Sequence, residues 1–262
     1  MVETSKPGAM MQEEERESPA TRRRRLAFQR RQKDFLRIAL AKFKESGIES
    51  FTLTGLAAES DYSKGTWYNH FGSISDVIVA IATENAMQQQ QYFREIFSEE
   101  NRPLDWKVTS IFLDYVSHAI TNPEMWTCGV LSRTWARGEG DVSLEGIASL
   151  DAAEGANQEI VLRMLREGDR LAVRGEGADE ALRRAKFALH TVRAAAAGLC
   201  VLNVVDNNYA WAQETAYEQT ITLILSTLET VRLPVDRVTP PEKLWESSRG
   251  RVRRLSYEWI IP

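Results

Sequence analysis

Large apolar residues recur every three or four positions along most of this chain, which is the spacing of amphipathic helices. In a helix expected from Thr21 to about Ser46, one buried stripe is formed by Phe35, Leu36, Ala39, Leu40 and Phe43. Gly47 follows as the expected left-handed C-cap. Because the sustained alternation of strands and the Asn-Gly turns of hairpins are both missing, the pattern predicts an all-α protein.

Three short apolar blocks follow this stripe. Thr52 is the expected N-cap of a helix from Leu53 to about Ser60. Ser63 is the expected N-cap of the next helix, Lys64 to Phe71, in which Trp67 and Phe71 point inward. A long helix is expected to begin at Ser73 or Ser75 and to continue to about Phe97.

The remaining pattern predicts further helices and four parts of the chain. Helices are expected over 104–121, from Pro123 to about Gly138, and over 143–167, 178–202 and 209–232. Residues 1–20 are polar and are expected to be disordered. The parts that follow are 21–83, 84–232 and a tail at 233–262. The aromatic residues of that tail leave open whether part of it packs on the body.

The distribution of charge along the chain indicates a kind of binding partner. The 262 residues have a formal net charge of −4, but residues 20–71 hold 11 lysines and arginines against 5 aspartates and glutamates, a balance of +6. A basic block on an acidic body is typical of a DNA-binding module joined to another domain. The alternative is a basic helix that is merely solvated.

Other classes find little support in the composition. Two cysteines, Cys128 and Cys200, give no disulfide framework and no cysteine-based metal site. The most apolar run, 188–205, is interrupted by His190 and Arg193, so no membrane span is expected. With no secretory signal at the N-terminus, we expect a soluble, cytoplasmic protein. No cofactor motif is present.

The blocks together have the order of a helix-turn-helix, in which one helix crosses the DNA backbone and the next enters the major groove. Residues 30–81 resemble the DNA-binding domain of the TetR family of bacterial regulators. The segments that carry the resemblance are FLRIALAKFKESGI at 35–48, TLTGLA at 52–57 and SKGTWYNHF at 63–71. The resemblance implies a three-helix helix-turn-helix domain joined by a long helix to a larger C-terminal helical domain that binds a ligand and dimerises.

The resemblance also implies roles for single residues in binding double-stranded DNA. Thr52 and Thr54 are expected to anchor phosphates. The expected base-edge residues are Lys64, Thr66 and Asn69, while Ser63 begins this helix and Gly65 permits close approach to the groove. Tyr68 and His70 are expected at the DNA backbone, with partial burial of Tyr68 and local packing of His70 as the alternatives. A basic N-terminal run is expected to contact the minor groove of the DNA, and the alternative is that it is merely solvated. The residues of this run are Arg22, Arg23, Arg24 and Arg25.

Three positions depart from the family pattern. Asp61 stands at the turn position that is usually glycine, so we expect left-handed geometry there. Trp67 replaces a smaller aliphatic residue, which is expected to shift the packing of its helix. Gly55 lies inside a helix, where glycine costs about 1 kcal/mol relative to alanine. These departures bear on operator preference.

For the C-terminal domain, the resemblance implies a homodimer formed by the last two long helices and a cavity for a small-molecule effector. The candidate lining residues are Trp106, Tyr115, His118, Trp126, Trp135, His190 and Tyr209. The alternatives are that the helices form the core of one subunit and that the aromatic residues are plain core. We therefore expect a ligand-responsive transcriptional regulator, a repressor that its effector releases from the operator. The other readings are a regulator with a vestigial pocket under the control of a partner protein, and a helical enzyme, for which no catalytic motif is present.

Overall fold

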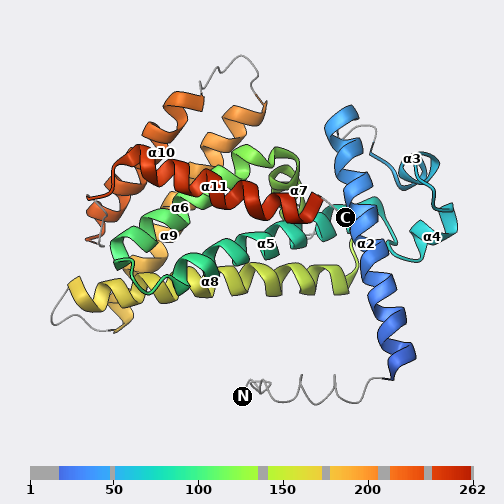
Figure 1. Cartoon of the computed structure of the whole chain (residues 1–262), viewed down its shortest axis with the longest axis horizontal. Helices are drawn as coiled ribbons and strands as arrows, with labels where there is room; N and C mark the ends of the chain where they lie inside the picture. Colours follow the sequence, from blue (N-terminus) through green and yellow to red (C-terminus); the bar gives the residue numbers. More distant parts are fainter. Residues whose placement is uncertain are drawn as a thin grey trace. The chain divides into compact units, whose positions relative to one another are not determined.

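The computed structural model describes residues 18–47, 51–134, 141–172, 178–205, 213–232 and 238–260. Over these ranges the chain forms ten helices and no strand (Figure 1), which confirms the all-α prediction. In chain order the helices are α2 (Pro19–Ser46), α3 (Leu53–Ala58), α4 (Lys64–Tyr68), α5 (Ile74–Ser98), α6 (Leu104–Thr121), α7 (Pro123–Thr134), α8 (Leu144–Ala172), α9 (Ala178–Val205), α10 (Gln213–Thr230) and α11 (Pro241–Ile260). None of these helices combines the length and hydropathy that crossing a membrane requires.

The chain divides into two compact units between Phe71 and Gly72. The smaller unit holds α2, α3 and α4, and the larger holds α5 to α11. The sequence placed this border inside the long helix, near residue 83. Helix α5 makes its most extensive contacts with α7 and α8, and it therefore belongs to the larger unit from its first turn.

Helix α2 begins two residues earlier than its apolar stripe predicts. Ser18 accepts a hydrogen bond from the backbone N–H of Thr21, and Pro19 occupies the first turn, where a missing N–H costs nothing. Residues 35, 36 and 39 of the stripe are buried. Gly47 ends the helix and donates its N–H to the carbonyl of Phe43. Its φ of 69° is positive as predicted, but its ψ of −176° lies outside the left-handed helical region that the sequence led us to expect.

The caps expected for the short helices are also present. The hydroxyl groups of Thr52, Ser63 and Ser73 accept hydrogen bonds from the backbone N–H three residues later, at 3.1, 3.2 and 3.1 Å. Helices α3 and α4 end two to three residues before the predicted positions, because turns begin at Glu59 and Asn69. The two helices are therefore fixed at their N-terminal ends.

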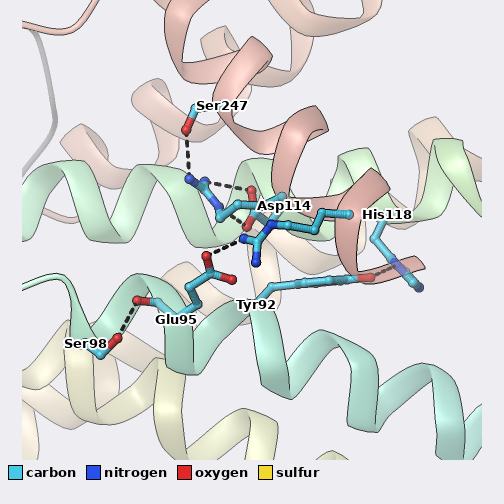
Figure 2. A network of polar contacts seen from close by, with 8 residues as sticks. Tyr92, Glu95, Ser98, Asp114, His118 and Ser247 are labelled. Carbon is cyan, nitrogen blue, oxygen red and sulfur yellow. Dashed lines mark hydrogen bonds and ion pairs between the residues drawn. The ribbon is translucent and has the colours of Figure 1, made fainter. Parts of the chain in front are cut away.

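In the larger unit, α5 lies alongside α8 and α7, and α6 packs against α11 (Figure 1). The core between them takes aromatic and aliphatic residues from α5, α6, α8, α9, α10 and α11. The part of the tail at 241–260 is thus a packed helix. Its Arg251 forms a buried double contact with Asp114 of α6, at 2.9 and 3.0 Å (Figure 2).

The helices expected at the dimer interface differ in what they expose. Ile221 and Leu228 of α10 are buried in the core of this subunit, as the alternative interpretation of that helix requires. On α9, by contrast, Ala194 and Gly198 are exposed. The side chains of Trp211 and Tyr217 lie outside the described residues.

Candidate DNA-binding surface and ligand cavity

Helix α4 presents its polar side chains to solvent and its aromatic side chain to the core. Lys64, Gly65, Tyr68 and Asn69 are exposed, and Thr66 is half-buried. The hydroxyl groups of Ser63 and Thr66 lie 2.8 Å apart, and that of Ser63 also caps the helix by accepting from the backbone N–H of Thr66. This pair is therefore engaged in holding the first turn, while the other polar groups remain available to a partner. Tyr68 is 45% exposed, so part of its side chain is covered and part is open to a partner.

Trp67 anchors α4 through a hydrogen bond that sequence reasoning missed. Its side chain is fully buried, and the ring lies 4.2 Å from that of Phe35. The indole N–H donates to Oγ of Ser60 at 2.9 Å. A buried indole N–H needs a hydrogen-bond acceptor. The sequence could therefore have indicated that Trp67 has an acceptor, but not which residue provides it. The bulk of Trp67 is thus accommodated by the turn that precedes α4.

The same serine organises the turn between α3 and α4, and this corrects the expectation for Asp61. Among the described residues other than glycine, positive φ occurs only at Arg232. Asp61 therefore does not adopt left-handed geometry. Instead, Oγ of Ser60 accepts the N–H of Tyr62 at 3.3 Å, and this side-chain contact closes the turn without the special backbone angles that glycine supplies.

Two polar contacts join α2 to this turn region. The hydroxyl of Tyr62 donates to Asp34 of α2 at 3.3 Å, and Lys42 pairs with Glu59 at 2.7 Å. Burial, with Asp34 nearby, raises the pKa of Tyr62 above its ordinary value. The tyrosine is therefore a hydrogen-bond donor at neutral pH, as its contact with a carboxylate requires.

His70 is packed locally, as the alternative for this residue proposed. Its ring stacks on Phe28 of α2 at 3.9 Å and meets Phe35 edge-on at 4.9 Å. Burial, assisted by the positive charge of Arg31, lowers the pKa of His70. The imidazole is therefore neutral at physiological pH. A contact of His70 with the DNA backbone stays a prediction.

The four consecutive arginines lie on α2 itself and not on an extended segment before it. All four are exposed. Successive residues of a helix point about 100° apart, so Arg22, Arg23, Arg24 and Arg25 cannot face one groove together. A shallow groove along this helix is lined by Arg23, Leu26, Ala27, Arg30, Arg31, Asp34 and Tyr62. Of the four arginines, only Arg23 lines this groove, together with Arg30 and Arg31.

The phosphate-anchor candidates on α3 are both exposed. Thr52 uses its hydroxyl oxygen to cap the helix by accepting from Gly55 N–H. Thr54, one residue into the helix, also reaches solvent. Backbone N–H groups at a helix start attract anions, but α3 has only six residues. Phosphate contact at these threonines stays a prediction.

The larger unit contains a cavity of about 90 Å³ between α5, α6, α7, α8 and α9. One water molecule needs about 10–15 Å³, so the space accommodates a small organic molecule. The lining residues are Ala82, Asn85, Ala86, Gln89, Phe93, Ile111, Phe112, Tyr115, Trp126, Gly129, Val130, Arg133, Glu154, Asn157, Gln158, Val161, Leu189, Arg193 and Ala197. Most of the walls are therefore apolar, with polar groups at a few points.

Of the pocket candidates, Tyr115 and Trp126 line this cavity. Trp106 does not, because it is buried in the core with the guanidinium groups of Arg102 and Arg251 at 4.8 and 5.5 Å from its ring. His190 is exposed on α9 and does not line the cavity either. Trp135 and Tyr209 lie outside the described residues.

His118 stands behind the cavity wall and holds one of its lining residues. The ring is fully buried, and burial lowers its pKa to about 4. Its Nε2 contacts Oδ1 of Asn85, while Nδ1 lies 3.1 Å from the hydroxyl of Tyr92 (Figure 2). His118 is therefore a neutral hydrogen-bonding group within the protein. Its effect on a ligand would pass through Asn85.

The polar lining residues themselves were missed by sequence reasoning. They include Asn85 and Asn157, and an ionic cluster in which Arg133 contacts Glu154 at 2.9 Å and Arg193 lies 3.8 Å from the same carboxylate. In the described part of the chain, no group of three or more acidic, histidine or cysteine side chains could hold a metal ion.

Comparison with known proteins supplies a fold but no close relative. No family model and no curated protein matches the chain. A solved structure of a protein of unknown function from Rhodococcus sp. RHA1 aligns with a TM-score of 0.53 and 18% identity, covering 72% of this chain and 91% of that one. The superantigen PfiT aligns at 0.51 with 19% identity, over 78% and 96% of the two chains.

A third solved structure is that of the TetR family transcriptional regulator PfmR from Thermus thermophilus. It aligns with a TM-score of 0.50 and 15% identity, covering 84% of this chain and 97% of that one. At such identities the likeness is one of fold. The chain therefore has the all-α fold seen in a TetR-type regulator, and the particular regulator it resembles among these structures is PfmR.

Proposed function

We propose that this protein is a cytoplasmic, homodimeric transcriptional regulator that binds an operator through its N-terminal helices. In this proposal the smaller unit, which ends at Phe71, binds DNA, and the larger unit binds a small-molecule effector and dimerises. Effector binding releases the protein from DNA, so it acts as a repressor. The fold shared with PfmR supports the class of protein.

The observation that carries the proposal is the construction of α4. Its first turn is capped by Ser63, and its buried face is anchored through Trp67. The opposite face exposes Lys64, Tyr68 and Asn69. A recognition helix requires this combination, because base readout needs polar side chains on a helix whose angle is fixed by the core.

The cavity favours control by a small molecule over control by a partner protein. A vestigial pocket would be filled by side chains, whereas this one retains about 90 Å³ and several polar lining groups. Apolar walls with a few convergent polar groups are typical of ligand sites. Release from DNA then requires that the ligand bind the two states of the dimer with different affinity.

The test is a salt-titrated binding assay that compares the DNA upstream of the protein's own gene with random DNA. Asn69→Ala and Lys64→Ala are preferable to Thr66→Ala, because the hydroxyl of Thr66 contacts the cap residue Ser63. A base contact at Asn69 predicts a loss of about 1–3 kcal/mol on the specific site alone. A base contact at Lys64 predicts a similar loss on the specific site, and removal of its positive charge also predicts a salt slope that is smaller by about one.

A matched control replaces a lysine that is exposed on the larger unit. Lys186 lies on α9, and Lys186→Ala should leave both affinity and salt slope unchanged. Equal affinity of the wild type for the upstream and random DNA, at physiological salt, would contradict the proposal. So would an equal loss from Asn69→Ala on both kinds of DNA, because that result excludes base readout by this side chain.

A further inference from the structure

Two asparagines in the cavity wall are each engaged at only one end of the side-chain amide. Asn85 of α5 is 6% exposed and Asn157 of α8 is 8% exposed, and both line the cavity. Polar groups buried to this extent nearly always have a hydrogen-bond partner. The end of each amide that lacks one therefore indicates what the cavity is built to receive.

The contact of Asn157 fixes which end of its amide is open. The side-chain nitrogen donates to the backbone carbonyl of Ala86 at 2.7 Å. A carbonyl only accepts, so the nitrogen must be the end that faces Ala86. The oxygen Oδ1 is buried and has no hydrogen-bond partner in the part of the chain that the structure describes. Because Asn157 lines the cavity, this oxygen is the end of its amide that is left for a partner there.

The orientation of Asn85 follows from the tautomer of His118. Nδ1 of this histidine faces the side-chain amide nitrogen of Asn122 at 3.2 Å, which only donates, so Nδ1 accepts. A neutral imidazole then carries its hydrogen on Nε2 and donates it to Oδ1 of Asn85. The amide nitrogen of Asn85 is left open. It lies 3.5 Å from the point that a Cβ of Gly129, another lining residue of the cavity, would occupy on α7.

We propose that the cavity binds a small, largely apolar molecule whose polar end places a neutral hydrogen-bond donor beside an acceptor, as a lactam or carboxamide does. The ligand carbonyl accepts from the amide nitrogen of Asn85, and the ligand N–H donates to Oδ1 of Asn157. Asn157 of α8 is hydrogen-bonded to Ala86, the residue that follows Asn85 on α5, so both asparagines are attached to the same turn of α5. This inference rests on the proposed function, in which the cavity is the effector site.

The apolar and charged surroundings favour a neutral ligand end over an ionic one. Phe93, Ile111 and Phe112 provide apolar surface for the body of the molecule. The charged lining residues already pair with one another, and the side chains of Arg133, Glu154 and Arg193 are 42, 30 and 33% exposed. Beside the buried asparagines the groups are neutral amides, and an ion placed there loses more hydration than amides return.

The test uses two probes of the same ring size, 2-piperidone and cyclohexanone. Both carry a ring carbonyl, and they differ only in whether the neighbouring ring position is N–H or CH₂. Affinities for the full-length protein are measured by protein-observed NMR titration. We expect 2-piperidone to bind about tenfold more tightly, because cyclohexanone leaves Oδ1 of Asn157 without a donor.

Variants locate this preference. Asn157→Leu removes the acceptor at nearly constant volume and is expected to bring the two affinities within twofold of each other. Asn85→Leu, the second variant, removes the donor to the carbonyl and should weaken both probes. The matched control is Gln88→Leu, which removes a buried amide on the same helix that does not line the cavity. It should preserve the tenfold preference. Circular dichroism checks the fold of each variant.

Equal affinities of the wild type for the two probes, or no binding of either at millimolar concentration, overturn the proposal. A preference that persists in folded Asn157→Leu overturns it as well. Operator binding is measured on the same wild-type sample. Specific DNA binding without a preference for 2-piperidone means that the proposed ligand class is wrong while the proposed regulator function stands. If the wild type shows no specific DNA binding, the proposed function itself is contradicted.

Discussion

Replacing Arg251 with methionine isolates the buried ion pair that holds α11 on α6. The guanidinium contacts both carboxylate oxygens of Asp114, at 2.9 and 3.0 Å, and the two side chains are 7 and 0% exposed. Methionine retains the length of the stem and removes the charge. Removal of one partner from a buried pair costs about 3–5 kcal/mol, because the other charge remains buried.

Protonation of the stranded carboxyl explains part of this loss. Burial raises the pKa of Asp114 from 3.8 to about 6 even though Arg251 opposes the change. Without the guanidinium the folded state holds this carboxyl neutral at pH 7. Keeping a group of ordinary pKa near 3.8 neutral at pH 7 costs about 4 kcal/mol, whereas the wild type, with this pKa near 6, already bears about 3 kcal/mol, at 1.36 kcal/mol for each pH unit. Protonation therefore accounts for about 1 kcal/mol of the loss at pH 7, and the rest of the expected loss of about 3–4 kcal/mol comes from the lost hydrogen bonds and packing of the guanidinium.

The pH dependence of the difference tests this reasoning. In the variant the folded state holds a proton that the unfolded state releases above its pKa of 3.8, so stability rises as the pH falls from 7. The wild type takes up this proton only near pH 6. The gap between the two proteins should therefore narrow by about 1 kcal/mol between pH 7 and pH 6.

The assay is urea unfolding followed by circular dichroism, with the transition of the larger unit fitted separately. The matched control is Arg254→Met, which removes an ion pair between α11 and Glu95 that is 53 and 35% exposed. That variant should lose less than about 1 kcal/mol. Comparable losses for Arg251→Met and Arg254→Met, or a gap that does not change with pH, would refute the account of the buried pair.

Three further changes follow from contacts already described. Ser60→Ala leaves the indole N–H of Trp67 without its acceptor, so hydrogen exchange of the amides in the core of α2 should show about 1–2 kcal/mol less protection. In a Trp67→Phe background, which has no indole N–H, Ser60→Ala should reduce the protection little further. Gly129→Ala places a methyl 3.5 Å from the amide nitrogen of Asn85; unfolding should show α7 stabilised by up to about 1 kcal/mol, while titration should show 2-piperidone excluded. His118 has its pKa lowered to about 4 by burial, so the unfolded state binds the extra proton and wild-type stability falls as the pH drops from 6.5 towards 4. In His118→Gln this slope should be shallower by about 1 kcal/mol per pH unit, and an unchanged slope would mean that the ring is not buried as a neutral group.

Local signals were enough to predict the helices and their caps. Thr52, Ser63 and Gly47 act within three or four residues of their own position, so their partners are fixed by chain geometry. The apolar stripe of α2 succeeded for the same reason. The expectation for Asp61 was wrong because the side chain of Ser60 closes the turn. The family pattern of turn residues does not indicate that a side-chain hydrogen bond can take the place of left-handed backbone geometry.

The fate of the C-terminal residues depended on partners distant in sequence. A basic run at 249–254 is typical of a solvated tail, and only Asp114 on α6 turns Arg251 into a buried residue. The same holds for Trp106, which is a core residue because it packs in the apolar cluster with residues of α8 to α11, with Arg251 at 5.5 Å from its ring. The composition of this segment predicted apolar contacts, but it could not predict the ion pair between Arg251 and Asp114, which are more than a hundred residues apart.

The polar groups of the cavity were visible in the sequence in one respect. Asn85 and Gln89 lie in phase with the buried Ile81, Tyr92 and Ile96 of α5. A polar residue in phase with an apolar stripe is buried wherever the stripe is, and burial of an amide requires a partner. Periodicity could therefore have selected these positions as candidate ligand contacts. It could not have shown which end of each amide is open, because that depends on acceptors and donors that other helices supply.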